Sequence, residues 1–223
     1  MNYFELIKSV SKIKLGEAPT LFSEITDDEY NKITDEINNA LEEFFLDDSH
    51  NFRRKDTTFN TVVGQQSYNH TYGVIVPNGL YLTDSDGNTH DLVFNPDYQS
   101  LKKQDTSENA CPSEWTIYND KILFYPVPDK VYTVHVAYIT DNWAKNAAGE
   151  EKLTMELETD EPNFPEKYHS VLKFMALREL YYSDPVRYQK YSRQASAKME
   201  QIIKESRGTL EKQPQVKMNN VKF

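Results

Sequence analysis

The run from Cys111 to Tyr138 most constrains what this chain can fold into, because it reads as β-sheet framework between helical segments. It contains one short aromatic strand, Pro112 to Tyr118, a tight turn at Asn119 to Lys121, and a returning strand, Ile122 to Pro126. Val131 to Tyr138 then alternates apolar and polar-tipped residues with period two, as a half-buried strand does. This run presents no side-chain pattern typical of catalysis and favours a scaffold protein.

Two helices are predicted before this β-rich region. The first covers Tyr3 to Leu15 and is stopped by Gly16. The second follows the capping box Thr26 to Glu29 and ends near Asp47. Its apolar stripe is formed by Tyr30, Ile33, Ile37, Leu41 and Phe44.

Several strands are expected between these helices and Cys111. Arg53 to Val63 alternates with period two, and Gly64 to Gln66 turns the chain into a hairpin that returns through Tyr68. Further strands are predicted at Val74 to Leu82 and at Thr89 to Phe94, on either side of the turn-forming cluster Asp84 to Asn88. The polar segment 95–110 has no strong pattern, and a short helix near 98–102 is one interpretation of it.

The C-terminal part predicts two consecutive helices and an arm. After a charged connector over 143–160, Pro165 marks a helix start, and Ser183-Asp184-Pro185 separates this helix from the next. The second helix is expected to end at Arg207-Gly208. The two apolar stripes are Tyr168, Val171, Leu172, Met175 and Leu180, and then Tyr188, Tyr191, Ala195, Met199 and Ile202.

These elements predict an α+β fold in which N- and C-terminal helices form a bundle packed beside a central antiparallel β-domain. The expected segments are 1–52 (N-terminal helical segment), 53–142 (β-domain), 143–207 (connector and C-terminal helices) and 208–223 (extended arm). The length of 223 residues allows one sizeable core or two small ones that share a boundary, and we favour one compact unit with appendages. The helices are expected to present lateral faces to neighbouring copies, which complete a core that is poor in aliphatic residues.

Composition excludes several classes of protein. The net charge of -10 argues against a protein that grips nucleic acid phosphates over a broad surface. The single cysteine, Cys111, permits no internal disulfide and no thiolate zinc cluster, which fits a reducing cytoplasm. The sequence shows neither the apolar core of a signal peptide nor eighteen consecutive apolar residues, so we expect a soluble protein with no membrane association.

No catalytic, cofactor or metal site is predicted. The five histidines lack metal-binding spacing, and His169 is interpreted as a packing or interface residue. Asp84 to Asn88 resembles a calcium loop only superficially, since its glycine is the fourth residue, and a hairpin turn is favoured. No phosphate-binding loop or nucleophile elbow is present. The sequence of an acidic chain does not exclude a pair of carboxylates for glycoside hydrolysis, but nothing singles out such a pair.

The order of motifs resembles the head-to-tail adaptors, or connectors, of tailed bacteriophages, especially the tail-tube adaptors of short-tailed phages. The motifs are Thr61 to Tyr68 (TVVGQQSY), the hairpin Pro112 to Pro128 and the helix start Asn163 to His169 (NFPEKYH). In that family, similar motifs recur in this order. The likeness covers most of the chain, although the insert 95–110 and the acidic connector 150–161 match no family marker.

The resemblance implies a structural virion protein at the head-tail junction, assembled in the cytoplasm of a host bacterium. It implies a ring of twelve copies beneath the portal protein, with a tail or nozzle protein on its other side. Genomic DNA would pass through the lumen during ejection without specific binding. The C-terminal arm would reach up to the portal, and the free protein would stay monomeric until the portal templates the ring.

The arm is the candidate binding segment. Its apolar residues alternate with lysines as an added edge strand would. A disordered terminus is the competing interpretation. The candidate portal-binding residues are Val216, Lys217, Met218, Val221, Lys222 and Phe223.

A second hypothesis belongs to another functional class. Trp115, Trp143 and the numerous tyrosines could form a carbohydrate-binding face, which would make the chain a glycan-binding β-module of a virion or surface protein. The flanking helices disfavour it, because such modules are nearly all β. Assembly with portal protein and binding to glycan arrays would discriminate between the two hypotheses.

Overall fold

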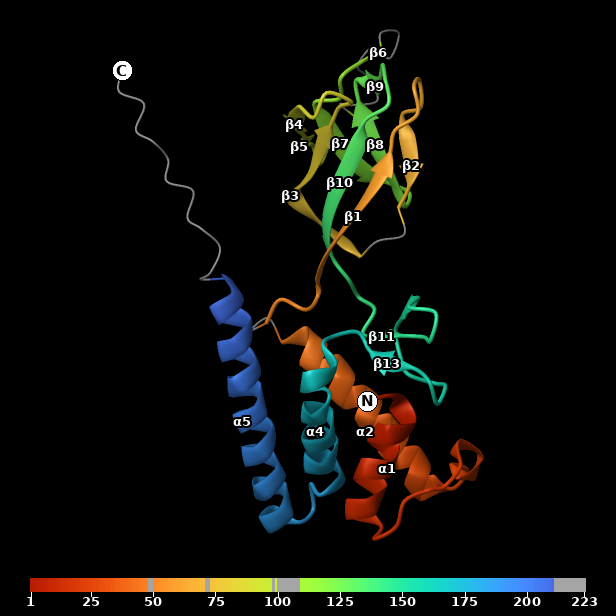
Figure 1. Cartoon of the computed structure of the whole chain (residues 1–223), viewed down its shortest axis with the longest axis vertical. Coiled ribbons are helices and arrows are strands. Elements are labelled where there is room, and N and C mark those ends of the chain that lie inside the picture. Colours follow the sequence, from red (N-terminus) through yellow and green to blue (C-terminus); the bar gives the residue numbers. More distant parts are fainter. Residues whose placement is uncertain (48–49, 71–72, 98, 100–108, 211–223) are drawn as a thin grey trace, which may run out of the picture. The chain divides into compact units, whose positions relative to one another are not determined.

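The computed structural model describes the whole chain except residues 48–49, 71–72, 98, 100–108 and 211–223 (Figure 1). The fold is α+β, as predicted. The chain divides into two compact units, where we expected one with appendages: a helical unit, Met1–Phe52 with the chain from Asn142 onwards, and a β unit, Arg53–Asp141. The β unit is therefore inserted between two halves of the helical unit.

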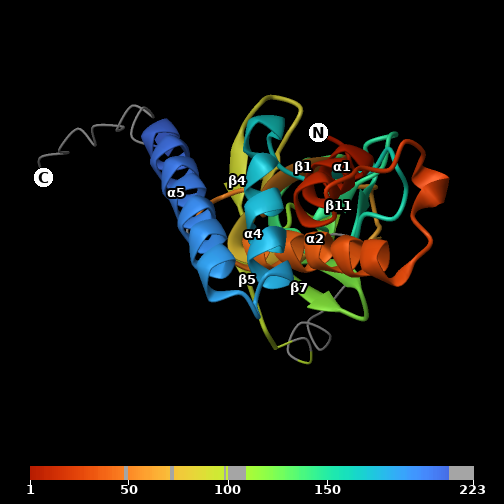
Figure 2. The same cartoon turned by 90° about the horizontal axis from the view of Figure 1, so that it is seen from below.

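The helical unit is a bundle built from both ends of the chain, as predicted. Its helices are α1 (Tyr3–Lys14), α2 (Asp28–Leu46), α4 (Ser170–Leu180) and α5 (Pro185–Leu210), with 3-10 turns η1 (Phe22–Glu24) and η2 (Glu166–Tyr168). α4 packs against the other three helices, and α1 also packs against α2 (Figure 2). Leu6, Ile37, Phe44, Leu172 and Ile202, each at most 1% exposed, are among the residues of its core.

The β unit contains two four-stranded sheets that share one apolar core. The first has the order β1 (Arg54–Asn60), β10 (Thr133–Ile139), β3 (Val74–Thr83), β4 (Thr89–Asp91). The second has the order β2 (Ser67–Asn69), β8 (Lys121–Tyr125), β7 (Glu114–Tyr118), β5 (Val93–Phe94). β6 (Asn109–Ala110) pairs with β9 (Val127–Pro128). The core side chains include Leu82, Trp115, Phe124, Val134 and Val136.

The predicted hairpin over Pro112 to Pro126 is confirmed. β7 and β8 pair antiparallel from Glu114↔Tyr125 to Tyr118↔Lys121. Asn119 and Asp120 both have positive φ, 49° and 55°, which is the backbone of a type I′ turn and explains why an Asn-Asp pair occupies it. The hairpin of β3 and β4 around Asp84 to Asn88 is also confirmed.

The predicted hairpin returning through Tyr68 is wrong. β1 pairs with β10, whereas β2 pairs with β8 in the other sheet. The Tyr68 hydroxyl accepts a hydrogen bond from the Val62 N–H at 2.9 Å and lies 2.9 Å from the Gln65 carbonyl. This tyrosine anchors the turn where the chain crosses from one sheet to the other. The period-two alternation before Gly64 therefore does not mean that β1 pairs with β2.

The segment between the β unit and α4 is more structured than its composition indicated. It forms a three-stranded sheet of β12 (Glu151–Lys152), β11 (Ala144–Lys145) and β13 (Glu161–Pro162), in that order. The carboxylate of Asp160, which is 0% exposed, accepts hydrogen bonds from the Glu156 and Leu157 N–H groups at 2.7 and 2.8 Å. Hydrogen bonds to a buried carboxylate therefore hold this acidic connector.

Helix ends differ in detail from the predictions. α2 is capped by Asp27, whose carboxylate accepts from the Glu29 and Tyr30 N–H groups, and not by Thr26. α1 begins with a capping box of Asn2 and Glu5 that the sequence analysis missed. α5 passes through Gly208 and ends at Leu210.

A candidate partner-binding groove in the helical unit

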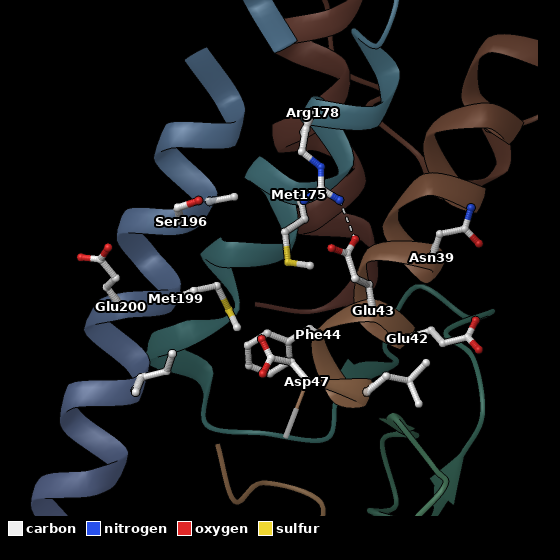
Figure 3. A pocket seen from close by; sticks show the side chains of 13 residues that line it. Asn39, Glu42, Glu43, Phe44, Asp47, Met175, Arg178, Ser196, Met199 and Glu200 are labelled. Atoms are coloured by element: carbon white, nitrogen blue, oxygen red, sulfur yellow. Dashed lines mark hydrogen bonds and ion pairs between the residues drawn. The ribbon is translucent and has the colours of Figure 1, made fainter. Parts of the chain in front are cut away.

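A groove of about 760 Å³ lies between α2, α4 and α5 (Figure 3). Each helix contributes one part of it, because α5 and α2 lie on either side of α4 in the view of Figure 3. The apolar part is formed by Phe44, Leu46, Met175, Met199 and Ile203. Leu46 is 53% exposed, so apolar surface here is accessible to a partner.

Acidic side chains surround this apolar surface. Glu42, Glu43 and Asp47 come from the end of α2, and Glu200 comes from α5. Among the described residues that line the groove, Arg178 of α4 is the only basic one. The groove therefore combines methionine side chains, which adapt to irregular surfaces, with excess negative charge, and its chemistry suits a basic, partly apolar protein surface.

One ion pair fixes the middle of the groove. The Arg178 guanidinium donates to Glu43 at 2.6 Å and also pairs with its neighbour Glu179 (Figure 3). Burial disfavours the charged guanidinium, but the hydrogen bonds that it donates to these two carboxylates outweigh that effect and raise the pKa of Arg178 above its ordinary value. Glu43 is thereby held within the helical unit, whereas Glu42 projects from the adjacent position of α2.

The predicted portal-binding residues, Val216 to Phe223, lie outside the described residues. Within the described ranges, no group of three or more His, Cys, Asp or Glu side chains is arranged to hold a metal ion. His169 is 1% exposed, and its ring nitrogens lie 2.9 Å from the Met1 carbonyl and 2.8 Å from that of Phe164, which confirms a packing role. Asp84 accepts from the Asp86 and Asn88 N–H groups as the anchor of a turn.

The environments of the two tryptophans bear on the carbohydrate hypothesis. Trp115 is 1% exposed in the core of the β unit, and Trp143 packs against Phe45 in the helical unit. A sugar-stacking platform needs accessible aromatic rings. The burial of Trp115 therefore removes one of the residues on which the carbohydrate hypothesis rested.

The groove itself was missed by the sequence analysis. Met175 and Met199 were assigned to apolar helix stripes. A periodic pattern within one helix cannot show that residues of three helices together line a groove. The nearest signal in the sequence is the run Phe44-Phe45-Leu46. One helix face cannot bury three consecutive apolar residues, so one of them must be exposed or covered by a partner.

Comparison with known proteins identifies the family. In the described part of the chain, no helix is long and apolar enough to cross a membrane. No curated protein matches the chain. A family model described as SU10 adaptor protein matches residues 1–217, which include both units and part of the C-terminal segment. The chain therefore belongs to the SU10 adaptor protein family, a family of structural adaptor proteins of bacteriophages.

Proposed function

We propose that this protein forms a dodecameric ring beneath the portal of a short-tailed phage, joining the capsid to the tail and continuing the DNA channel. The observation that carries the proposal is the family match over 1–217, because it covers the helical unit, the β unit and the beginning of the arm together. A tail or nozzle protein docks on the opposite side of the ring, and assembly takes place in the host cytoplasm. Neither step requires catalysis by this chain.

The arm, with Val216, Met218, Val221 and Phe223, binds the portal in this proposal. Burying four such side chains contributes roughly 6 to 12 kcal/mol, whereas ordering about ten residues costs about 1 to 2 kcal/mol each. One arm therefore binds weakly. A ring that presents many arms to a ring of portal subunits gains avidity, because every engaged arm raises the effective concentration of the others.

The negative charge of the chain supports a role as a conduit. Of its ionisable side chains, 35 are Asp or Glu and 25 are Lys or Arg. Carboxylates along a lumen repel phosphates, so packaged DNA slides through without adhering. Solubility alone is the simpler explanation of this excess, and a conduit adds a second use for it.

The test combines the full-length chain with the portal protein of the same phage. Mass photometry and cryo-EM should show portal particles that carry a ring of this protein. Deletion of 217–223 should abolish capture while the circular dichroism spectrum and melting temperature stay unchanged. Equal capture of the truncated chain would refute the role of the arm. A monomer that binds glycans on an array and does not bind the portal would refute the proposed adaptor function.

A further inference from the structure

Charge is divided between two helices that flank α4. α2 contains six acidic residues and one lysine, whereas α5 contains six basic residues and two acidic ones. A helix so rich in basic residues stands out in a chain of net charge -10. Figure 3 shows α5 on one side of α4 and α2 on the other. The helical unit therefore carries opposite charges on two different sides.

The charges of α2 gather on its solvent-facing side. Residues three and four positions apart form a stripe directly opposite the buried residues Ile33, Ile37 and Leu41, and all of them are exposed. Three are carboxylates with no hydrogen bond or ion pair among the described residues, and Leu46 ends the stripe. This α2 stripe consists of Asp28, Lys32, Asp35, Asn39, Glu42 and Leu46.

A matching stripe runs along α5. It also lies opposite the buried residues, here Tyr191, Ala195 and Ile202, and every member is exposed. Lys190 contacts only the ring of Tyr191, at 5.1 Å, and the other two cations have no hydrogen bond or ion pair in the described part of the chain. This α5 stripe consists of Val186, Lys190, Arg193, Ala197, Glu200 and Lys204, and therefore carries three cations and one carboxylate.

We infer that the α5 stripe of one copy packs against the α2 stripe of the next copy. The inference rests on the proposed ring and names its lateral contact. A ring requires a head-to-tail interface between two different surfaces of the same chain, and these stripes are two such surfaces with complementary charge. Leu46, 53% exposed, and Val186, 79% exposed, provide apolar area beside the charges.

Charge also selects this pairing over the alternatives. Contacts of α2 with α2, or of α5 with α5, would bring mainly like charges together, because each stripe has three charges of one sign and one of the other, and this is costly at an interface. Isolated surface ion pairs contribute little, but a contact between two whole stripes places several opposite charges together while it covers apolar atoms. Because Glu42 and Leu46 also line the groove, the neighbouring α5 would cover that wall of it.

Paired charge reversals test the inference. One variant reverses the α2 stripe, D35K/E42K, and the other reverses the α5 stripe, K190E/R193E. A control, D91K/E158K, makes the same change in net charge as the first variant at exposed positions outside both stripes. Each chain is mixed with portal protein of the same phage, and the fraction of portal carrying a ring is measured by mass photometry.

We expect wild type and the control to form rings and each reversed variant to lose at least tenfold in assembly. An equimolar mixture of the two reversed variants should recover assembly, because each reversed stripe then meets one of opposite charge. A chain that carries all four substitutions should recover it as well. Unchanged circular dichroism spectra verify that the variants fold.

Four outcomes would overturn the inference. If wild type forms rings and the reversed variants do so equally well, or if the mixture fails to recover, the stripes are not the lateral contact although the ring stands. If wild type forms no ring with the portal, the proposed function fails as well. Carbodiimide crosslinking of mixed isotope-labelled copies gives a direct check. It should join Asp35 or Glu42 to Lys190 or Lys204 of another copy, and crosslinks from these carboxylates to portal lysines instead would contradict it.

Discussion

At the scale of single residues, contacts with backbone atoms decide the local structure at two positions. Asp160 accepts hydrogen bonds from backbone N–H groups, and Gly79 lies against backbone carbonyls. The connector around Asp160 is acidic and reads as solvated chain, yet its carboxylate is buried and accepts three hydrogen bonds. Gly79 sits inside β3, where a glycine would ordinarily weaken a strand.

Asp160 should stabilise the helical unit only while it is ionised. Burial raises its pKa, but hydrogen bonds from two backbone N–H groups and from Lys152, 2.9 Å away, outweigh this and hold it below the ordinary 3.8. Because the folded state lowers the pKa, the contribution is complete above pH 3.8 and is lost as pH falls below it. We expect Asp160→Asn to cost about 2 kcal/mol at pH 7 and to lose less stability than wild type on acidification. Urea unfolding at pH 7 and pH 3 measures both, and a neutral effect at pH 7 would contradict the role of the carboxylate.

Gly79 should not tolerate alanine. A Cβ at this position would lie 2.7 Å from the Ala137 carbonyl oxygen and 2.8 Å from that of Val76, at the point where the pairing of β3 with β10 shifts register. Neither backbone atom can move without breaking the ladder. We expect Gly79→Ala to destabilise the β unit by about 1 to 3 kcal/mol. Gly87→Ala is the comparison variant. No atom lies within 4 Å of a Cβ at Gly87, but φ is +82°, so this substitution measures backbone strain without a steric clash.

At the scale of elements, periodicity and punctuation predicted the helices well, because their signals are local. The stop at Ser183-Asp184-Pro185 and the stripe from Ile33 to Phe44 depend on neighbours within a few positions. Strand pairing depends on residues far apart, and so the return through Tyr68 was assigned to the wrong partner. The groove could not be predicted either, since it depends on how α2, α4 and α5 pack together.

The helix cap is where a local signal was misread by one position. Thr26 and Asp27 are both acceptable capping residues, but only Asp27 accepts hydrogen bonds from the first turn of α2. We expect Asp27→Ala to lower the free energy of unfolding by about 1 kcal/mol and Thr26→Ala to leave it nearly unchanged. Chemical denaturation of the two variants side by side decides this, and an equal loss in both would restore the cap that the sequence favoured.

At the scale of the whole molecule, the chain consists of a helical unit with a β unit inserted into it. The ends of the insertion are tied to each other: the Thr140 N–H donates to the Arg53 carbonyl at 2.9 Å, and the Arg53 guanidinium pairs with Asp141 at 3.2 Å. The length of the chain allows one core or two small ones, and we favoured one, whereas the structure has two. Aromatic residues, among them Trp115, Tyr132 and Phe124, fill the second core.

The β unit should therefore fold by itself. Residues 53–141 begin and end on paired backbone, contain their own apolar core, and close each core sheet with strands from within the same range. We expect the isolated fragment to be folded, with tryptophan fluorescence typical of the buried Trp115 indole and a cooperative melt. Phe124→Ala, which removes a ring that is 1% exposed, should cost about 3 to 5 kcal/mol and abolish that melt in the fragment. A fragment that stays unfolded while the full chain is native would mean that the helical unit supplies contacts on which the β unit depends, and the insertion would then be one half of a single cooperative structure.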